Sequence, residues 1–225
     1  LKTTEASNIA IQNFIIYQFA LIIISFFALI YNSFFELFTN VVILIYLIIA
    51  GFILNILIII GLFIISFAKN TDKLIINFFI HIGSKIKIIK LQETTKHKIN
   101  NFIENFYNES IELSKNKLKF MNKVFIHIIS LCSLYTIPLI IFYAMGDFSS
   151  LNIMQSIFIS SFVMLIGLAT PMPGGTGGVE YAFIFLFGNF ITGVKLNALM
   201  ITWRFITFYL PIIISICLIS FKKRK

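Results

Sequence analysis

Residues 41–68 read VVILIYLIIAGFILNILIIIGLFIISFA and contain no charged side chain. About 18 or more consecutive apolar residues are enough for a helix to cross the hydrocarbon core of a bilayer. Backbone N–H and C=O groups inside lipid must be paired within the chain, so such a run forms a helix rather than an isolated strand. The segment therefore predicts a transmembrane helix.

The composition of the whole chain agrees with that prediction. Hydrophobic residues make up 59% of the 225 positions, charged residues 12%, and the mean hydropathy is +0.96. A soluble domain averages about 45–50% apolar and about 25% charged residues, so a soluble globular protein is excluded. The formal net charge of +9 comes from basic residues in loops and in the C-terminal tail, where they set membrane orientation. We therefore predict no nucleic-acid partner.

The other apolar segments extend this pattern along the chain. Together with residues 41–68 they predict an all-α fold, a polytopic membrane helix bundle that forms a single transmembrane domain over residues 1–225. The predicted helices are Ile9–Ile30, Val41–Ala68, Val124–Ala144, Ile153–Ala169, Val179–Ile191 and Leu196–Ser220. Pro138 and Pro211 are expected to kink their helices, because proline removes a backbone donor. The chain opens at Leu1 rather than at a methionine, and we expect it to be a fragment that lacks an N-terminal part.

The distribution of basic residues predicts the orientation. Residues 69–123 carry eleven lysines and five acids, and the chain ends in FKKRK. The short loops 31–40 and 146–152 carry acids but no Lys or Arg. Because basic loops stay in the cytoplasm, we predict a multi-pass protein of the cell (plasma) membrane, with both ends of this chain cytoplasmic. Parity then requires residues 179–191 to cross, which gives six crossings.

The basic insertion 69–123 carries a helical pattern of its own. Apolar residues recur at helical spacing in two stretches, around 75–89 and around 99–113. Such amphipathic helices can lie at the membrane interface with their lysines near anionic headgroups. They can equally form a helical hairpin packed under the bundle. The sequence leaves both arrangements of this cytoplasmic insertion open.

The stretch 169–180, ATPMPGGTGGVE, interrupts a membrane helix. Proline clashes with the preceding helical turn, and glycine costs about 1 kcal/mol in a helix. Unwound backbone at membrane depth persists only where protein or water surrounds it, and transporters use such broken helices to bind anions through free N–H groups. A tight interfacial turn is the alternative, but it would need fewer helix breakers. The predicted binding residues of the break are Pro171, Pro173, Gly174, Gly175, Gly177 and Gly178.

Two charged residues accompany the break. Glu180 lies in the first turn of the next predicted helix. A carboxylate there complements the helix dipole, and it can at the same time receive the amine of a lipid headgroup. Arg204 lies inside an apolar segment, at a cost of about 2.5–3.5 kcal/mol, and either snorkels or faces a cavity or partner. The six-crossing topology puts Glu180 near the cytoplasmic side and Arg204 in the outer third. It predicts that they mark two depths of one pathway, although a direct salt bridge is the alternative.

The remaining chemistry-bearing residues form no recognisable site. The histidines have no metal-ligand spacing, and Cys132 and Cys217 fall inside apolar runs as small apolar side chains. The sequence contains no P-loop, nucleophile elbow or zincin motif. We therefore predict no metal, no cofactor and no catalytic constellation in this chain.

Residues 169–188, ATPMPGGTGGVEYAFIFLFG, and residues 201–211, ITWRFITFYLP, resemble the transmembrane domain of the lysylphosphatidylglycerol synthase/flippase family. Members of that family show a P-x-P-G-G-x-G-x-x-E-like signature, then a helix with an Arg before an aromatic, Pro-containing stretch. Outside residues 169–211 the likeness lies in hydropathy and in the long basic loop. The resemblance implies a domain that moves aminoacylated phosphatidylglycerol between leaflets. It also implies that a soluble domain, absent here, transfers lysine from lysyl-tRNA to the lipid.

Two functional hypotheses follow. In the first, the chain is a lipid translocase for phosphatidylglycerol-type or aminoacylated lipids, with the break at 171–178, Glu180 and Arg204 handling the headgroup. In the second, it is the membrane component of a phosphatidylglycerol lysyltransferase whose acyl-transfer chemistry resides elsewhere. The expected partners are an anionic or aminoacylated phospholipid and either a separate synthase domain or a second copy of the chain.

Overall fold

The computed structural model describes residues 3–35, 37, 42–67, 116–170 and 172–222. Within these ranges the chain is helical and contains no strand, so the predicted all-α fold is confirmed. The amphipathic helices predicted around 75–89 and 99–113 lie outside the described residues.

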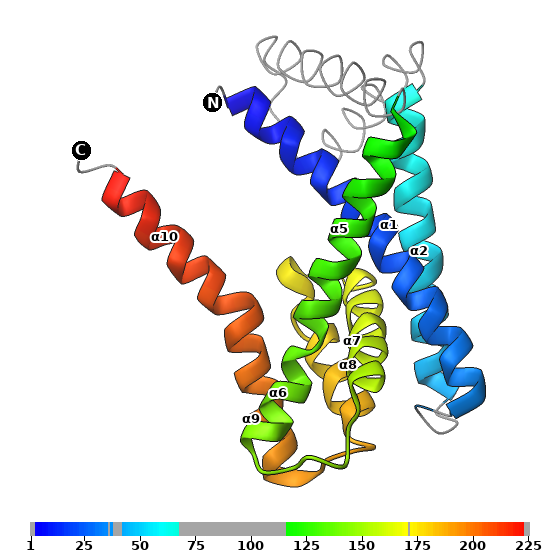
Figure 1. Cartoon of the computed structure of the whole chain (residues 1–225), viewed down its shortest axis with the longest axis vertical. Helices are drawn as coiled ribbons and strands as arrows, with labels where there is room; N and C mark the ends of the chain where they lie inside the picture. Colours follow the sequence, from blue (N-terminus) through cyan, green and yellow to red (C-terminus); the bar gives the residue numbers. More distant parts are fainter. Residues whose placement is uncertain (1–2, 36, 38–41, 68–115, 171, 223–225) are drawn as a thin grey trace, which may run out of the picture. The chain divides into compact units, whose positions relative to one another are not determined.

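The helices follow the apolar segments but differ from them at their ends (Figure 1). Both α1 and α5 begin earlier than the sequence predicted, and α8 ends four residues before the predicted Ile191. The elements are α1 Thr3–Phe35, α2 Val42–Phe67, α5 Lys117–Tyr135, α6 Ile137–Ala144, α7 Ile153–Leu168, the 3₁₀ turn η1 Pro173–Gly175, α8 Gly178–Phe187, α9 Gly193–Arg204, the π-helical turn η2 Phe205–Tyr209 and α10 Leu210–Lys222.

Four helical stretches of the described chain are long and apolar enough to cross a membrane: Gln12–Phe35, Ile43–Gly61, Lys117–Ala144 and Gly193–Ser220. The remaining two apolar helices are shorter. At 1.5 Å per residue, α7 with 16 residues is about 24 Å long and α8 with 10 residues about 15 Å. Both fall short of a hydrocarbon core of about 30 Å. Six crossings therefore stay a prediction, and the length of α8 argues against a straight crossing there.

The chain forms two compact units. One comprises Leu1–Ala20 and Ile56–His127, and the other comprises Leu21–Asn55 and Ile128–Lys225. In the first unit, the ring of Phe19 on α1 meets the ring of Phe120 on α5 edge-on, with centroids 5.5 Å apart. All residues of the candidate functional site lie in the second unit.

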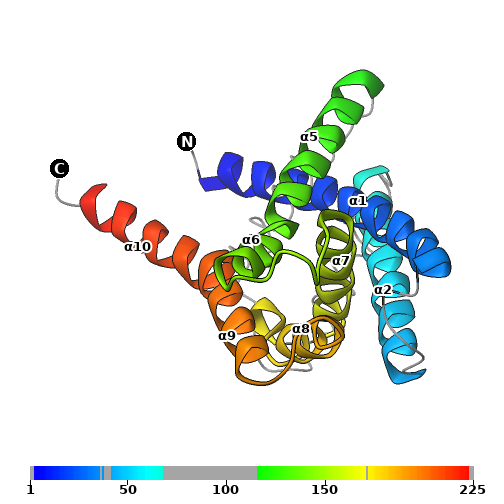
Figure 2. The same ribbon diagram turned by 60° about the horizontal axis from the view of Figure 1, so that its bottom comes forward.

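In the second unit, α6, α7, α8 and α9 form a ring in which each helix contacts the next and α9 contacts α6 (Figure 2). Aromatic side chains fill the core of this ring. In lipid, helices are held together by van der Waals packing rather than by exclusion of water, and these large side chains supply much of the packed surface. The rings of Phe183 and Phe187 on α8 stack with centroids 4.3 Å apart. The buried aromatic residues of the ring are Phe142, Phe162, Phe183, Phe187 and Trp203.

The helix break before α6 coincides with a proline. Thr136 separates α5 from α6, and Pro138 lies in the first turn of α6, so the helix is interrupted next to the proline at which the sequence predicted a kink. The carbonyl of Tyr135 accepts hydrogen bonds from the hydroxyls of Ser156 at 2.7 Å and Ser160 at 3.4 Å, both buried on α7. These side-chain bonds tie α7 to the kinked helix.

A close approach of α2 and α7 depends on one glycine. A Cβ atom at Gly51 would collide with the backbone carbonyl of Leu165 on α7. Leu44, Ile48 and Asn55, which share this face of α2, are buried. Small residues let helix backbones approach one another in membranes, so Gly51 fixes the distance at which α2 supports α7.

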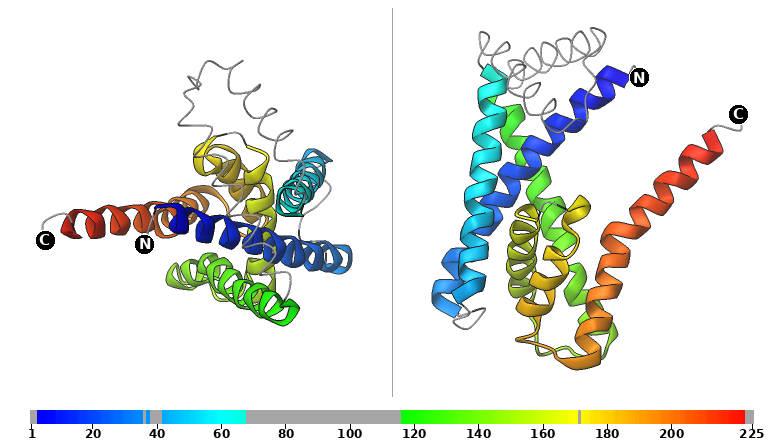
Figure 3. Two further views of the ribbon diagram at one scale, coloured as in Figure 1. Left: turned by 90° about the horizontal axis from the view of Figure 1, so that it is seen from above. Right: turned by 180° about the vertical axis from the view of Figure 1, so that it is seen from behind.

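The helices α7 and α8 form an antiparallel hairpin, and the loops before α7 and after α8 lie at the same end (Figure 3). The two helices pack closely against each other near the tip of the hairpin, and each contributes a glycine to this contact. A Cβ atom at Gly167 would meet the side chain of Val179, and one at Gly178 would meet Thr170. The hairpin therefore holds the Pro- and Gly-rich break at its tip.

Candidate functional site

The chain between α7 and α8 is unwound, as the sequence predicted. Helix α7 ends at Leu168, and α8 begins at Gly178. Gly174 has φ +69° and ψ +14°, and Gly177 has φ +89°. Residues other than glycine rarely adopt these backbone conformations. The break was expected to leave the N–H groups of Gly174 and Gly175 free of intrahelical partners. This is wrong at Gly175, whose N–H donates to the carbonyl of Met172 at 2.9 Å in the 3₁₀ turn.

Glu180 closes the start of α8. It is the third residue of the helix, and its Oε2 accepts a hydrogen bond from the N–H of Gly177 at 2.6 Å. A carboxylate at this position satisfies one of the unpaired donors of the first turn and complements the positive end of the helix dipole. Glu180 therefore uses one oxygen for its own helix and has the other free for a different partner.

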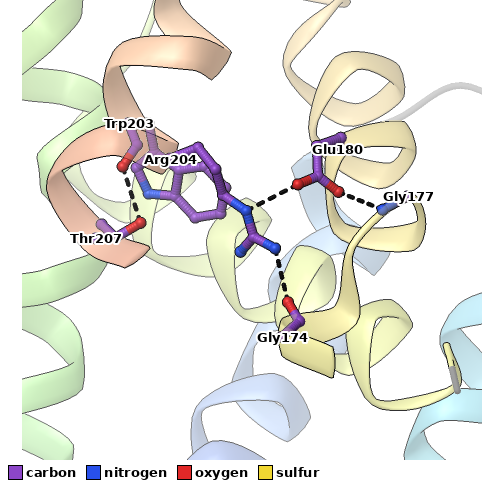
Figure 4. A network of polar contacts seen from close by, with 6 residues as sticks. All are labelled: Gly174, Gly177, Glu180, Trp203, Arg204 and Thr207. Atoms are coloured by element: carbon purple, nitrogen blue, oxygen red, sulfur yellow. Dashed lines mark hydrogen bonds and ion pairs between the residues drawn. The ribbon is translucent and has the colours of Figure 1, made fainter. Parts of the chain in front are cut away.

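The other oxygen of Glu180 binds Arg204 directly. Arg204 Nε lies 2.8 Å from Glu180 Oε1, and Arg204 Nη2 donates to the carbonyl oxygen of Gly174 at 2.6 Å. The guanidinium thus joins the unwound loop, the first turn of α8 and the end of α9 (Figure 4). The prediction that Glu180 and Arg204 lie at two depths of one pathway is wrong.

The cause of that error is the length of α8. The prediction treated residues 179–191 as a full crossing, whereas α8 has only 10 residues and returns into α9 through residues 188–192. In an antiparallel pair this short, the first turn of α8 lies beside the last turn of α9. Stacking of Phe183 on Trp203, with centroids 4.6 Å apart, fixes that register one turn away from the ion pair.

Phe208 belongs to the site, although the sequence reasoning did not single it out. The Cζ atom of Arg204 lies 4.5 Å from the centroid of the Phe208 ring, which is the geometry of a cation–π contact. The same ring packs on the loop, because a Cβ atom at Gly174 would lie 2.5 Å from its Cε2 atom. The spacing of an aromatic residue four positions after an intramembrane arginine could have indicated the contact.

The structure brings Gly174, Gly177, Glu180 and Arg204 together, and it gives the other predicted residues different places. Gly175 and Gly178 lie at the packing contact of α7 with α8, where Cβ atoms would meet Val179 and Thr170. The backbone of Pro173 begins the 3₁₀ turn η1. Pro171 lies outside the described residues.

The ion pair is shielded and electrically balanced. The Arg204 and Glu180 side chains are 8% and 22% exposed, so both charges are largely withdrawn from solvent or lipid. A charge at such a position is tolerated only when it is paired and hydrogen-bonded. No described residue accepts a hydrogen bond from Nη1 of Arg204. The hydrogen bonds of the guanidinium to described residues thus run through Nε and Nη2.

Neither the site nor the rest of the described chain contains a cluster of three metal-ligating side chains. The charged groups that the site does contain, Arg204 and Glu180, offer recognition of charge. An arginine next to a carboxylate can receive a headgroup that carries both an anionic and a cationic group.

Comparison with known proteins identifies a family. The family model for the lysylphosphatidylglycerol synthase TM region matches residues 1–215, which extend from the N-terminus into the first part of α10. No curated protein sequence and no solved structure matches the chain significantly.

Proposed function

The chain belongs to the family of lysylphosphatidylglycerol synthase transmembrane regions, and from this premise we propose that it translocates phospholipids between membrane leaflets. The proposed cargo is phosphatidylglycerol or its aminoacylated form. The single observation that carries the proposal is the Arg204–Glu180 ion pair at the tip of a broken hairpin. A membrane protein keeps such costly charges away from water mainly at sites that bind or move a polar ligand.

The ion pair suggests how a headgroup is exchanged. In this proposal a lipid phosphate binds Arg204 through Nη1, and an ammonium group replaces Arg204 as the partner of Glu180. When no lipid is bound, each side chain supplies the charge that the headgroup would supply, so neither is left unpaired. A lipid with both groups satisfies both side chains, whereas phosphatidylglycerol satisfies only Arg204. We expect aminoacylated phosphatidylglycerol to be the preferred cargo.

The lengths of α7 and α8 support a placement of the site within the membrane. If the α6–α7 and α8–α9 loops lie on one side, a hairpin of helices about 24 and 15 Å long reaches part of the way through a core of about 30 Å. Four crossings and one such re-entrant hairpin keep both ends of the chain on the same side. The basic residues of the C-terminal tail and of the insertion 69–123 favour the cytoplasm as the side on which both ends lie, and the plasma membrane as the location of the protein.

Leaflet exchange in liposomes tests the function. The full chain is reconstituted with fluorescent phosphatidylglycerol, with and without added lysyl-phosphatidylglycerol, and the accessible fraction is followed by chemical quenching of the outer leaflet. Wild-type protein should accelerate exchange, and unlabelled lysyl-phosphatidylglycerol should compete. Glu180→Gln and Arg204→Gln should each slow exchange by tenfold or more, since each removes one charge of the site.

Lys195→Gln is the matched control, because Lys195 is an exposed lysine on the same helix as Arg204. It should leave the rate unchanged. Wild-type exchange in both charge variants, measured on protein that remains folded, would contradict the assignment of Glu180 and Arg204 to the transport site. An absence of exchange by the wild-type chain with every lipid would contradict the translocase itself.

The second candidate function is the membrane component of a phosphatidylglycerol lysyltransferase. The observation that favours it is the family match, which names a synthase region. In this case a separate domain transfers the lysyl group, and the chain presents the lipid. Co-expression with a lysyltransferase domain should then raise lysyl-phosphatidylglycerol synthesis even if the purified chain moves no lipid. That combination of results separates the two functions.

A further inference from the structure

Three features weaken the helix that follows Arg204, all within nine residues. The turn Phe205–Tyr209 is π-helical, and the N–H of Leu210 donates to the carbonyl of Phe205, five residues earlier. The Thr207 hydroxyl donates to the carbonyl of Trp203 at 2.8 Å, a back-bond that bends helices. Pro211, two residues after the end of the π turn, has no N–H to donate. Sharp bends in helices occur at such π turns and prolines.

Helix α10 beyond this point depends little on the rest of the second unit. Every residue from Tyr209 to Ser220 is exposed, and the helix extends away from the α6–α9 ring (Figure 3). By contrast, Leu199 and Trp203 on the preceding helix α9 are buried. The direction of α10 is therefore set at the π turn rather than by packing along its length.

Phe208 lies inside the π turn and contacts both the arginine of the ion pair and the unwound loop before α8. Its ring lies under the guanidinium of Arg204, 4.5 Å from Cζ to the centroid. It also packs against Gly174, where even an added Cβ atom would come within 2.5 Å. Any change in the direction of α10 that rotates the π turn must move this ring, and with it one face of the arginine.

We propose that the π-helical turn Phe205–Tyr209 is a hinge for α10, and that Phe208 is a positioning residue that couples the hinge angle to the Arg204–Glu180 pair. With the ring on Gly174, Arg204 is held against Glu180 and the loop carbonyl. When the ring withdraws, Arg204 loses its support and the pair opens. The inference goes beyond lipid transport, because it concerns a motion that occurs without any ligand.

Distances between spin labels test the hinge. Both native cysteines are replaced by serine, and labels are placed at Ile140 on α6 and Leu218 on α10, which are 60% and 65% exposed. Leu218 lies about 13 Å beyond Tyr209 at 1.5 Å per residue, so a 20° change in direction displaces it by about 5 Å. Double electron–electron resonance is recorded on the full chain in phosphatidylcholine nanodiscs, with no anionic lipid present.

The proposal predicts a pattern over six proteins: the wild type and the Phe208→Leu and Phe205→Leu variants, each with and without Glu180→Gln. Glu180→Gln removes the charge that holds Arg204 in the ion pair, and it should shift the mean Ile140–Leu218 distance by about 5 Å. Phe208→Leu keeps an apolar side chain but loses the ring face, and in this background Glu180→Gln should no longer shift the distance. Phe205→Leu is the matched control, because it alters another aromatic residue of the same turn and should preserve the response.

A second label pair shows that the variants remain folded. Labels at Ile140 and Ile184 on α8 lie within the α6–α9 ring and do not span the hinge, so their distance should be the same in all proteins. If the Ile140–Leu218 distance distribution is narrow and has the same mean in every protein, the hinge is overturned. A shift on Glu180→Gln that persists in Phe208→Leu would overturn the coupling role of Phe208. Both results are independent of lipid exchange, so failure of this proposal is distinguishable from failure of the transport function.

Discussion

Replacing Arg204 by leucine removes one end of an ion pair and leaves the other end in place. Among the described residues, Glu180 would keep only the N–H of Gly177 as a partner, and the carbonyl of Gly174 would lose the guanidinium donor that lies 2.6 Å away. Breaking a buried pair from one side costs about 3–5 kcal/mol, because the remaining charge is uncompensated. We therefore expect Arg204→Leu to destabilise the folded protein, although leucine suits lipid better than arginine does.

The double-mutant cycle isolates the contribution of the pair. Glu180→Gln removes the carboxylate charge but keeps an oxygen for Gly177, and it should cost about 2–4 kcal/mol, since hydrogen bonds to charged groups contribute about 1.5–3 kcal/mol each. The double variant should lose less than the sum of the single losses, because it leaves no unpaired charge. A coupling free energy of about 1–3 kcal/mol is expected for residues in one network.

Unfolding by sodium dodecyl sulfate in mixed micelles, followed by tryptophan fluorescence, measures these free energies. Trp203 is the single tryptophan of the chain, is 3% exposed and stacks on Phe183 next to the pair, so it reports on the site itself. Lys195→Gln serves as the control for removal of an exposed charge and should change the free energy of unfolding by less than about 0.5 kcal/mol. Additive single losses, with a coupling below about 0.5 kcal/mol, would refute the conclusion that the pair stabilises the site.

Three further predictions follow from the backbone contacts. Gly51→Ala should destabilise the protein by about 2 kcal/mol or more, because its methyl group collides with a backbone carbonyl of α7. Gly61→Ala on the same helix meets nothing within 4 Å and should be neutral or stabilising by up to about 1 kcal/mol. Both are measured by the same unfolding assay. Gly174→Ala should cost about 1–3 kcal/mol, since φ is +69° and its Cβ atom would press on Phe208, and it should also slow lipid exchange. A spin label at Thr176 should lie within the hydrocarbon region by oxygen and nickel-chelate accessibility, and an interfacial depth would contradict the re-entrant hairpin.

The sequence alone determined the class of the protein and the location of its unusual backbone. Uncharged apolar runs long enough to span a bilayer are typical of segments buried in lipid. Inside lipid, a single segment can pair all of its backbone groups within itself only as a helix. The break at residues 169–177 was also predictable, because Pro and Gly disfavour a helix whatever surrounds them. The interruption of the helix at Thr136, next to Pro138, follows from the same local rule. The family resemblance depended on these same residues, and the family match extends it to residues 1–215.

The pairing of Glu180 with Arg204 was decided only by the tertiary structure. The two residues are 24 positions apart in the chain, and their separation in space depends on where α8 ends and how α8 returns into α9. Hydropathy does not indicate that end, because Phe190 and Ile191 beyond it are as apolar as the helix itself. The stacking of Phe183 on Trp203 then sets the register of the two helices. A contact made across two helices depends on that packing, whereas the helix breaks depend only on the residues at the break.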